Sequence, residues 1–131
     1  MRRERRSAEA GSVSILSAGV LVLACVLTLV AVDVGRALVS RAHAQTAADA
    51  AALAAAQELA IPSGQRPADA AAEFAADNGA ALVSCRCEPG STEAIVEVSV
   101  PVHLVFLGGD RTVSGRARAV VVGTTLGHAR G

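Results

Sequence analysis

The residues of this 131-residue chain that could do chemistry are few and scattered. Its three histidines, His43, His103 and His128, lie far apart, and the chain has no G-x-S-x-G, H-E-x-x-H or G-x-x-x-x-G-K motif. These are the patterns that place a nucleophile, a catalytic zinc or a phosphate group. We therefore expect no enzymatic activity, no cofactor and no small-molecule substrate.

Cys85 and Cys87 are the closest pair of reactive side chains. Residues two apart on a strand point to the same face, so four states are open: a strained local bridge, two free thiols, a bond to another chain, or a metal site with His103. Zinc takes four ligands, or three and a water, and no second C-x-C or H-x-H follows. Reactive thiols usually lie at a helix start or beside a cation, which disfavours a thiol enzyme. We favour a structural role, with the thiols reduced or locally bridged.

The elements that carry these residues begin with an apolar run. Apolar residues make up 52% of the chain, which disfavours disorder, and aromatic residues only 2%, which disfavours nucleic-acid binding by base stacking. Between Val13 and Val32, twelve of twenty positions are Val, Leu or Ile, and no charge occurs from Gly11 to Val32. Twenty helical residues span about 30 Å, the thickness of a bilayer core. We expect a transmembrane helix at 12–33.

The formal net charge of zero hides the orientation signal. Residues 1–11 carry +2 and residues 12–131 carry −2. Arginine-rich flanks stay in the cytoplasm, so 1–11 is predicted to be a cytoplasmic basic tail of a single-pass plasma-membrane protein, with the rest extracytoplasmic.

Two other membrane interpretations remain open for the apolar run. Ala42-His43-Ala44 has the A-x-A form of a signal-peptidase site, although it lies well beyond Val32. Val22-Leu23-Ala24-Cys25 loosely matches a lipobox. Either would make the protein a lipoprotein or an exported small binding module whose apolar segment is only an export signal.

A long helix is predicted to continue out of the membrane. No proline occurs before Pro62, and strong helix formers dominate, so one helix should run from about Ser12 to Ala60, with 34–61 as a projecting Ala-rich part. Its small residues could pack against a neighbouring helix or against the chain's own domain. A weak apolar stripe is expected at Leu38, Val39, Ala42, Thr46, Leu53, Ala56 and Ala60.

Three charged residues of this helix are candidates for packing or assembly. Asp33 and Arg36 are three apart and could pair at the membrane interface, or could be ordinary charges at headgroup level. Asp49 could make an intersubunit contact or only add solubility.

Residues 62–131 are predicted to form a small α+β domain. Pro67 opens a second short helix that ends at Asn78-Gly79 and should lay Phe74 on a sheet. Alternation of apolar and polar residues then predicts a three-stranded antiparallel meander over Ala81–Cys87, Ile95–Leu107 and Arg111–Val122. Pro101 suggests an edge position or a bulge, and the tail TTLGHARG is expected to be loose.

A family resemblance is carried by the order VDVGR, then an Arg-Ala-x-Ala-Gln step, then AADAAALAAA, all behind the apolar run. It resembles the N-terminal segment of TadE/TadG-like proteins of the tight-adherence (Flp) pilus system. NGAALVSCRC and the following EVSVPV resemble the actinobacterial TadE-like branch found beside helicase and secretion genes.

The resemblance implies a pilin-like fold and a pseudopilin of the inner membrane, either a minor component or an assembly factor of a Tad/Flp-type pilus or secretion system. The implied partners are other pilin-like subunits and the secretion machinery, including its membrane platform and ATPase, besides the lipid bilayer. Gly11 and Ser12 would flank a prepilin-type cleavage site. Processed pilins of this kind usually have Glu at the fifth position after the cleavage, where this chain has Leu16.

Overall fold

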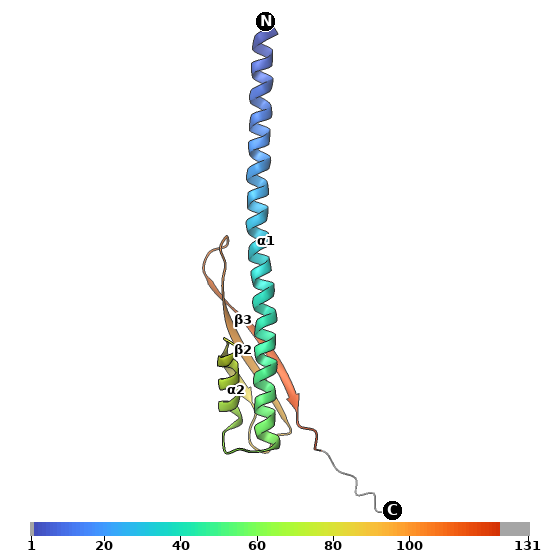
Figure 1. Cartoon of the computed structure of the whole chain (residues 1–131), viewed down its shortest axis with the longest axis vertical. Helices are drawn as coiled ribbons and strands as arrows, with labels where there is room; N and C mark the ends of the chain where they lie inside the picture. The colour runs from blue at the N-terminus through green and yellow to red at the C-terminus, as the bar shows by residue number, and fades with distance from the viewer. Residues whose placement is uncertain (1, 124–131) are drawn as a thin grey trace, which may run out of the picture.

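The computed structural model describes residues 2–123 of the chain, and the side chains of residues 11–123. In order, the elements are helices α1 (Arg2–Ala60) and α2 (Pro67–Asp77) and strands β1 (Ala81–Arg86), β2 (Glu93–His103) and β3 (Asp110–Val120). The predicted α+β fold, with a long helix, a short helix and a three-stranded antiparallel meander, is confirmed (Figure 1). The predicted loose tail lies outside the described residues.

Helix α1 is one uninterrupted helix of 59 residues, and it begins earlier than the expected Ser12. Its N-terminal half is uncovered: residues 11–32 are all exposed, and no other element of the described part of the chain lies beside them (Figure 1). The helix contains a window of mean hydropathy 2.8, none of it buried, and is long and apolar enough to cross a membrane. The β-sheet and α2 gather around its C-terminal half, and we call this unit, residues 33–123, the head.

The C-terminal half of α1 forms the centre of the head. The buried face of the helix consists almost entirely of alanine: Ala44, Ala47, Ala48, Ala51, Ala52, Ala54, Ala55 and Ala56. Most of the predicted apolar stripe lies outside the core of the head, because Leu38, Val39 and Leu53 are exposed. The valines of the sheet fill the space between the layers, and the helix contributes mainly small side chains, with Leu59 partly buried against this core.

Close packing of α1 on β3 depends on Gly115. A Cβ atom built at this position would overlap the backbone carbonyl of Ala44. The missing side chain therefore lets the strand lie directly on the helix backbone, which a residue with a Cβ would prevent.

The sheet has the order β1-β2-β3, with both pairs antiparallel. Alternate valines of β2 point to the core, and Val96 and Val98 are its largest fully buried side chains. Pairing with β1 ends at Ser99, so Pro101 lies where β2 has only β3 beside it, as the edge prediction required. A register shift in β1 falls between Leu82 and Ser84.

Strand β2 ends at His103, earlier than the predicted Leu107. Residues 104–109 instead form a loop that turns through Gly108 and Gly109, both with positive φ. Alternation of apolar residues did not continue the strand here, because the backbone N–H groups of the loop bind a side chain of α1.

Helix α2 has the predicted bounds, with Pro67 in its first turn. Its buried residues are Pro67 and the alanines Ala70, Ala71 and Ala75. Phe74, which was expected to lie on the sheet, is 45% exposed and is not part of the hydrophobic core. Since the helix approaches its neighbours through alanine, a phenylalanine on that face would hold the layers apart.

Candidate functional site at the foot of the head

The strongest polar constellation lies where the apolar half of α1 meets the head. Asp33 follows the last residue of the apolar run, yet its side chain is only 3% exposed. Its Oδ1 accepts a hydrogen bond from the Val105 N–H (2.8 Å), and its Oδ2 accepts from Phe106 (2.8 Å) and Leu107 (3.1 Å). Three successive amides thus satisfy one carboxylate, an arrangement stronger than neutral hydrogen bonds.

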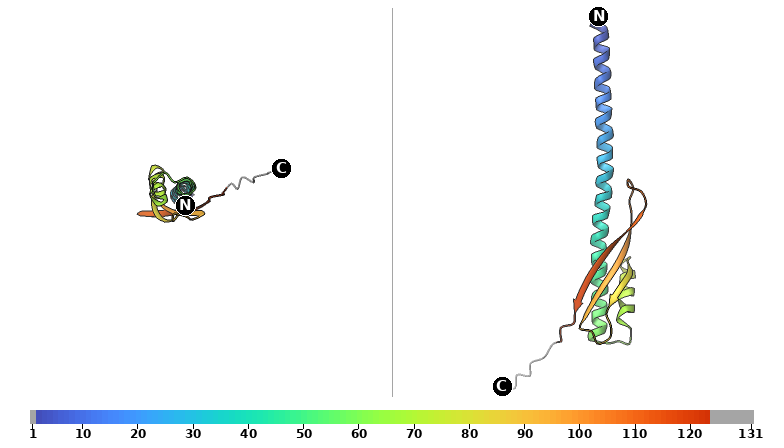
Figure 2. Two further views of the ribbon diagram at one scale, coloured as in Figure 1. Left: turned by 90° about the horizontal axis from the view of Figure 1, so that it is seen from below. Right: turned by 180° about the vertical axis from the view of Figure 1, so that it is seen from behind.

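The loop that supplies these amides, residues 104–109, is called here the β2–β3 tip. At its base, His103 Nδ1 lies 2.8 Å from Asp110 Oδ1, and the two residues are paired across the strands. Inside the tip, the Leu104 N–H donates to the Gly109 carbonyl at 3.4 Å. Figure 2 shows the tip lying along α1 and pointing towards its N-terminal half. The three hydrogen bonds to Asp33, called here the clamp, therefore tie the far end of the hairpin to the end of the apolar run.

Sequence reasoning found Asp33 but not its partner. The proposed interaction with Arg36 is not what satisfies the carboxylate, because the hydrogen bonds found for Asp33 all go to the tip. Arg36 is exposed on the next turn of the helix. Two features of the sequence point towards this contact. One is an aspartate directly after the apolar run, and the other is a set of three apolar residues followed by two glycines.

Asp49 lies on the exposed side of α1 and accepts a hydrogen bond from Gln45 Nε2 at 3.1 Å. The same Gln45 amide donates to the Arg116 carbonyl of β3 at 2.9 Å. His43 Nε2 lies 2.7 Å from the Asn78 carbonyl at the end of α2, and must donate because a carbonyl only accepts. Gln45 thus connects α1 to the sheet, and His43 connects α1 to the end of α2. No motif in the sequence predicted either contact.

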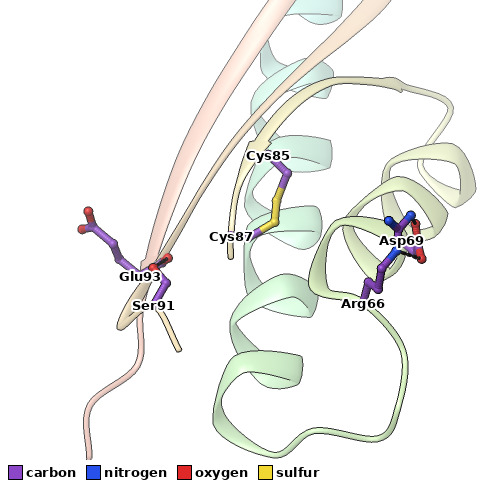
Figure 3. Close-up of a disulfide and its surroundings, with 6 residues drawn as sticks. All are labelled: Arg66, Asp69, Cys85, Cys87, Ser91 and Glu93. Carbon is purple, nitrogen blue, oxygen red and sulfur yellow. Dashed lines mark hydrogen bonds and ion pairs between the residues drawn. A yellow bond between two sulfur atoms is a disulfide. The ribbon is translucent and has the colours of Figure 1, made fainter. Parts of the chain in front are cut away.

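Cys85 and Cys87 are bonded to each other at the end of β1, with their Cα atoms 5.5 Å apart (Figure 3). Cys87 is buried and Cys85 half-buried, and both contribute to the hydrophobic core. His103, the third member of the considered metal site, contacts Asp110 instead. In the part of the chain that the structure describes, no three His, Cys, Asp or Glu side chains are grouped so as to hold a metal ion.

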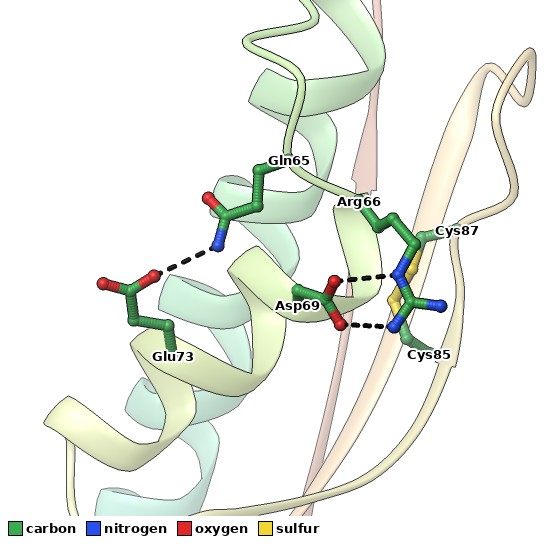
Figure 4. Close-up of polar contacts among 6 residues, drawn as sticks. All are labelled: Gln65, Arg66, Asp69, Glu73, Cys85 and Cys87. Atoms are coloured by element: carbon green, nitrogen blue, oxygen red, sulfur yellow. Dashed lines mark hydrogen bonds and ion pairs between the residues drawn. A yellow bond between two sulfur atoms is a disulfide. The ribbon is translucent and has the colours of Figure 1, made fainter.

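Two exposed polar contacts hold the start of α2 (Figure 4). Gln65 donates to Glu73 at 3.1 Å, and Arg66 binds both carboxylate oxygens of Asp69 at 2.7 and 2.8 Å. The hydrogen bonds from Arg66 lower the pKa of the Asp69 carboxyl below its ordinary value. These contacts stabilise a surface turn and form no concave site.

The outer face of the sheet carries two cross-strand ion pairs, Glu97 with Arg116 and Glu93 with Arg118. Each arginine already has a carboxylate partner on its own face. This face is therefore a satisfied polar surface and does not offer two free cations to an anion.

Gly11 and Ser12, the residues of the implied processing site, are exposed within the continuous α1 helix. They lie at the opposite end of the apolar run from Asp33. The structure brings none of the other predicted site residues near them.

Comparison with protein families matches residues 11–58 to the Tad family model, described as "Putative Flp pilus-assembly TadE/G-like". The match begins at Gly11 and follows α1 through the apolar run and the alanine face, ending before α2 and the sheet. No curated protein and no solved structure matches the chain. Over helix α1, the chain is thus similar to a family of Flp pilus-assembly proteins.

Proposed function

We propose that this protein is a single-pass, pilin-like structural protein that acts as a minor component or assembly factor of a Tad/Flp-type pilus or secretion system. Its basic tail lies in the cytoplasm and its head outside the plasma membrane. Its partners are other pilin-like subunits, the membrane platform and ATPase of the machine, and the lipid bilayer. It has no catalytic role and needs no cofactor, nucleic acid or small-molecule substrate.

One observation carries this proposal: a single helix is both the apolar span and the central element of the head. Residues 11–32 of α1 are apolar and uncovered, while Ala44 to Ala56 lie in the core of the head. The family match covers both halves of that helix. An anchored head carried on a continuous helix suits a subunit that assembles by packing, and the family is structural rather than enzymatic.

The exposed side of α1 offers the surface for such packing. Leu38, Val39 and Leu53 are all exposed on the side opposite the alanine face, and Asp49 lies among them. This strip continues into the uncovered apolar half of the helix. Lateral association along it would bury large apolar side chains that the head leaves in water.

The alternative function, a lipoprotein or exported binding module, requires the apolar segment to be removed or shortened. Cleavage after Ala44 would separate Asp33 from the β2–β3 tip and cut the helix at the residue that Gly115 packs against. Lipidation at Cys25 would require a cut in the middle of an uninterrupted helix. Both features support an intact helix.

Mass spectrometry of the mature N-terminus in the native membrane tests the two functions directly. An N-terminus at Met1 or Ser12 supports the pilin-like function. A mature chain that begins with acylated Cys25, or with Gln45, would reject it in favour of the alternative.

The assembly role is tested by co-purification with pilus components. We expect Leu53→Glu to weaken co-purification, because it places a charge in the apolar strip, and Asp49→Leu to weaken it, because it removes the polar contact that Asp49 makes with a neighbouring subunit. Leu16→Glu tests docking at the other end of the helix. Glu88→Gln, in the β1–β2 turn, is the matched control. Recovery of unchanged amounts with both strip variants would count against assembly through this face.

A further inference from the structure

We propose that the β2–β3 tip is a second membrane contact, with the side chains of Val105, Phe106 and Leu107 seated in the outer lipid–water boundary beside α1. The proposal rests on the proposed function in one respect, that α1 spans the bilayer. It adds a site at which the head itself touches lipid.

The position of the tip along α1 is fixed by its hydrogen bonds. The uncharged run from Gly11 to Val32 corresponds to roughly 33 Å of helix, close to the thickness of a bilayer core. Asp33, the next residue, therefore lies at the edge of the hydrocarbon. Because the amides of residues 105–107 bind Asp33, the tip lies at the same depth.

Within the tip, polar and apolar groups are sorted to opposite sides. The three amides point to the carboxylate, whereas the three side chains are 52%, 45% and 70% exposed for Val105, Phe106 and Leu107. Backbone N–H groups that are already paired can enter an apolar environment without the cost of an unpaired donor. In water, the same loop would expose three consecutive large apolar side chains at the end of a hairpin.

Charge around the tip fits a lipid surface. Arg36 is exposed on α1 one turn beyond Asp33, and Arg111 is exposed at the start of β3. The nearby acid Asp110 has its Oδ1 atom 2.8 Å from His103 Nδ1. Two exposed cations immediately outside an apolar insertion suit the phosphate groups of anionic lipids. A second protein copy would explain the apolar side chains, but not their coincidence with the end of the span.

Depth-dependent fluorescence quenching tests the proposal on the full chain. Single-cysteine variants Phe106→Cys and Leu107→Cys, in a Cys25→Ser background that retains the Cys85–Cys87 bond, are labelled with an environment-sensitive dye. The labelled proteins are reconstituted into vesicles of phosphatidylcholine and phosphatidylglycerol. Quenching is then compared between aqueous iodide and spin-labelled lipids. The parent without an introduced cysteine measures background labelling.

Two control positions set the scale. Val20→Cys reports the middle of the span, and Gln57→Cys reports an exposed site on the same helix about 36 Å beyond Asp33. We expect both tip labels to be quenched several-fold more by lipid spin labels near the headgroups than the label at position 57, and to be protected from iodide.

The outcomes separate this inference from the function on which it rests. If the label at position 20 is quenched by lipid but either tip label is as open to iodide as position 57, the tip inference is wrong and the span stands. Tip labels shielded from both quenchers would indicate a protein neighbour and would also overturn it. A label at position 20 that no lipid quenches would reject the span, and with it both proposals.

The role of Asp33 is tested in the same assay. Asp33→Ala removes the acceptor of all three amides, and we expect the label at position 106 to lose most of its lipid quenching while that at position 20 keeps it. Asp77→Ala, which removes an exposed carboxylate from helix α2, is the matched control. Unchanged quenching in Asp33→Ala would show that the clamp does not set the depth of the tip.

Discussion

At the scale of single residues, Gly115 lies directly against the backbone of Ala44 and leaves no room for a side chain. We predict that Gly115→Ala lowers the free energy of unfolding by about 1–3 kcal/mol or more, because the added Cβ meets the immobile backbone of Ala44. Chemical unfolding in detergent, followed by circular dichroism, measures the loss. Gly123→Ala is the matched control, since none of the described residues lies within 4 Å of its Cβ position. Equal stability of the two variants would contradict the packing described for β3.

Asp33 is the other residue whose removal has a local and measurable effect. Asp33→Ala leaves three backbone donors without their partner, at a cost of about 1–3 kcal/mol for each donor that stays buried. We predict that amide hydrogen exchange at residues 105–107 accelerates strongly in this variant. The amides of the central strand β2 should keep their protection, because this strand is paired with β1 and β3. Slow exchange at 105–107 in the variant would mean that something other than the carboxylate protects them.

At the scale of elements, the alanine face of α1 determines how closely the layers approach. We predict that Ala51→Leu lowers the free energy of unfolding by about 1–3 kcal/mol, because Ala51 is fully buried in the hydrophobic core and a larger side chain would overpack it. Leu53→Ala, two residues away on the exposed side, should change it by less than about 0.5 kcal/mol in detergent. Thermal unfolding of both variants gives the comparison, and a larger loss for Leu53→Ala would place the core on the wrong side of the helix.

The order and type of every element could be predicted from the sequence, because proline, glycine and the change of period mark them plainly. The bounds of α2 and the inward valines of β2 were among these features. Which side of α1 is buried could not be predicted, since the rule that larger side chains face inward fails when alanine gives the closest approach. The end of β2 was also missed, because alternation at Leu104 and Phe106 does not reveal that Asp33, 72 residues before Val105, binds the loop amides.

The candidate site was predictable only in part, for a related reason. Asp33 stands out as the first charge after an apolar run, so its importance is visible in the sequence. Its contacts are harder to foresee, because they come from backbone amides, which every residue except proline carries. The same holds for Gln45 and His43, whose partners are backbone carbonyl groups of elements distant in the sequence.

At the scale of the whole molecule, the head depends on the helix that anchors it. We predict that a fragment of residues 33–131 folds, whereas residues 62–131 alone do not, because removing α1 exposes the inner valines of the sheet and leaves too little core. Circular dichroism and cooperative unfolding distinguish the two fragments. A cooperatively folded 62–131 would show that α1 is only an attachment and not part of the core.

The absence of any break in α1 between residues 2 and 60 also has a directional consequence. In a continuous helix, the two halves cannot rotate independently about the helix axis. The side of the membrane-spanning half that contacts a neighbour therefore fixes the direction in which the head faces. Successive residues differ by about 100° around a helix. Moving a contact by one position within the bilayer would therefore turn the sheet, the ion pairs and the β2–β3 tip through the same angle outside it.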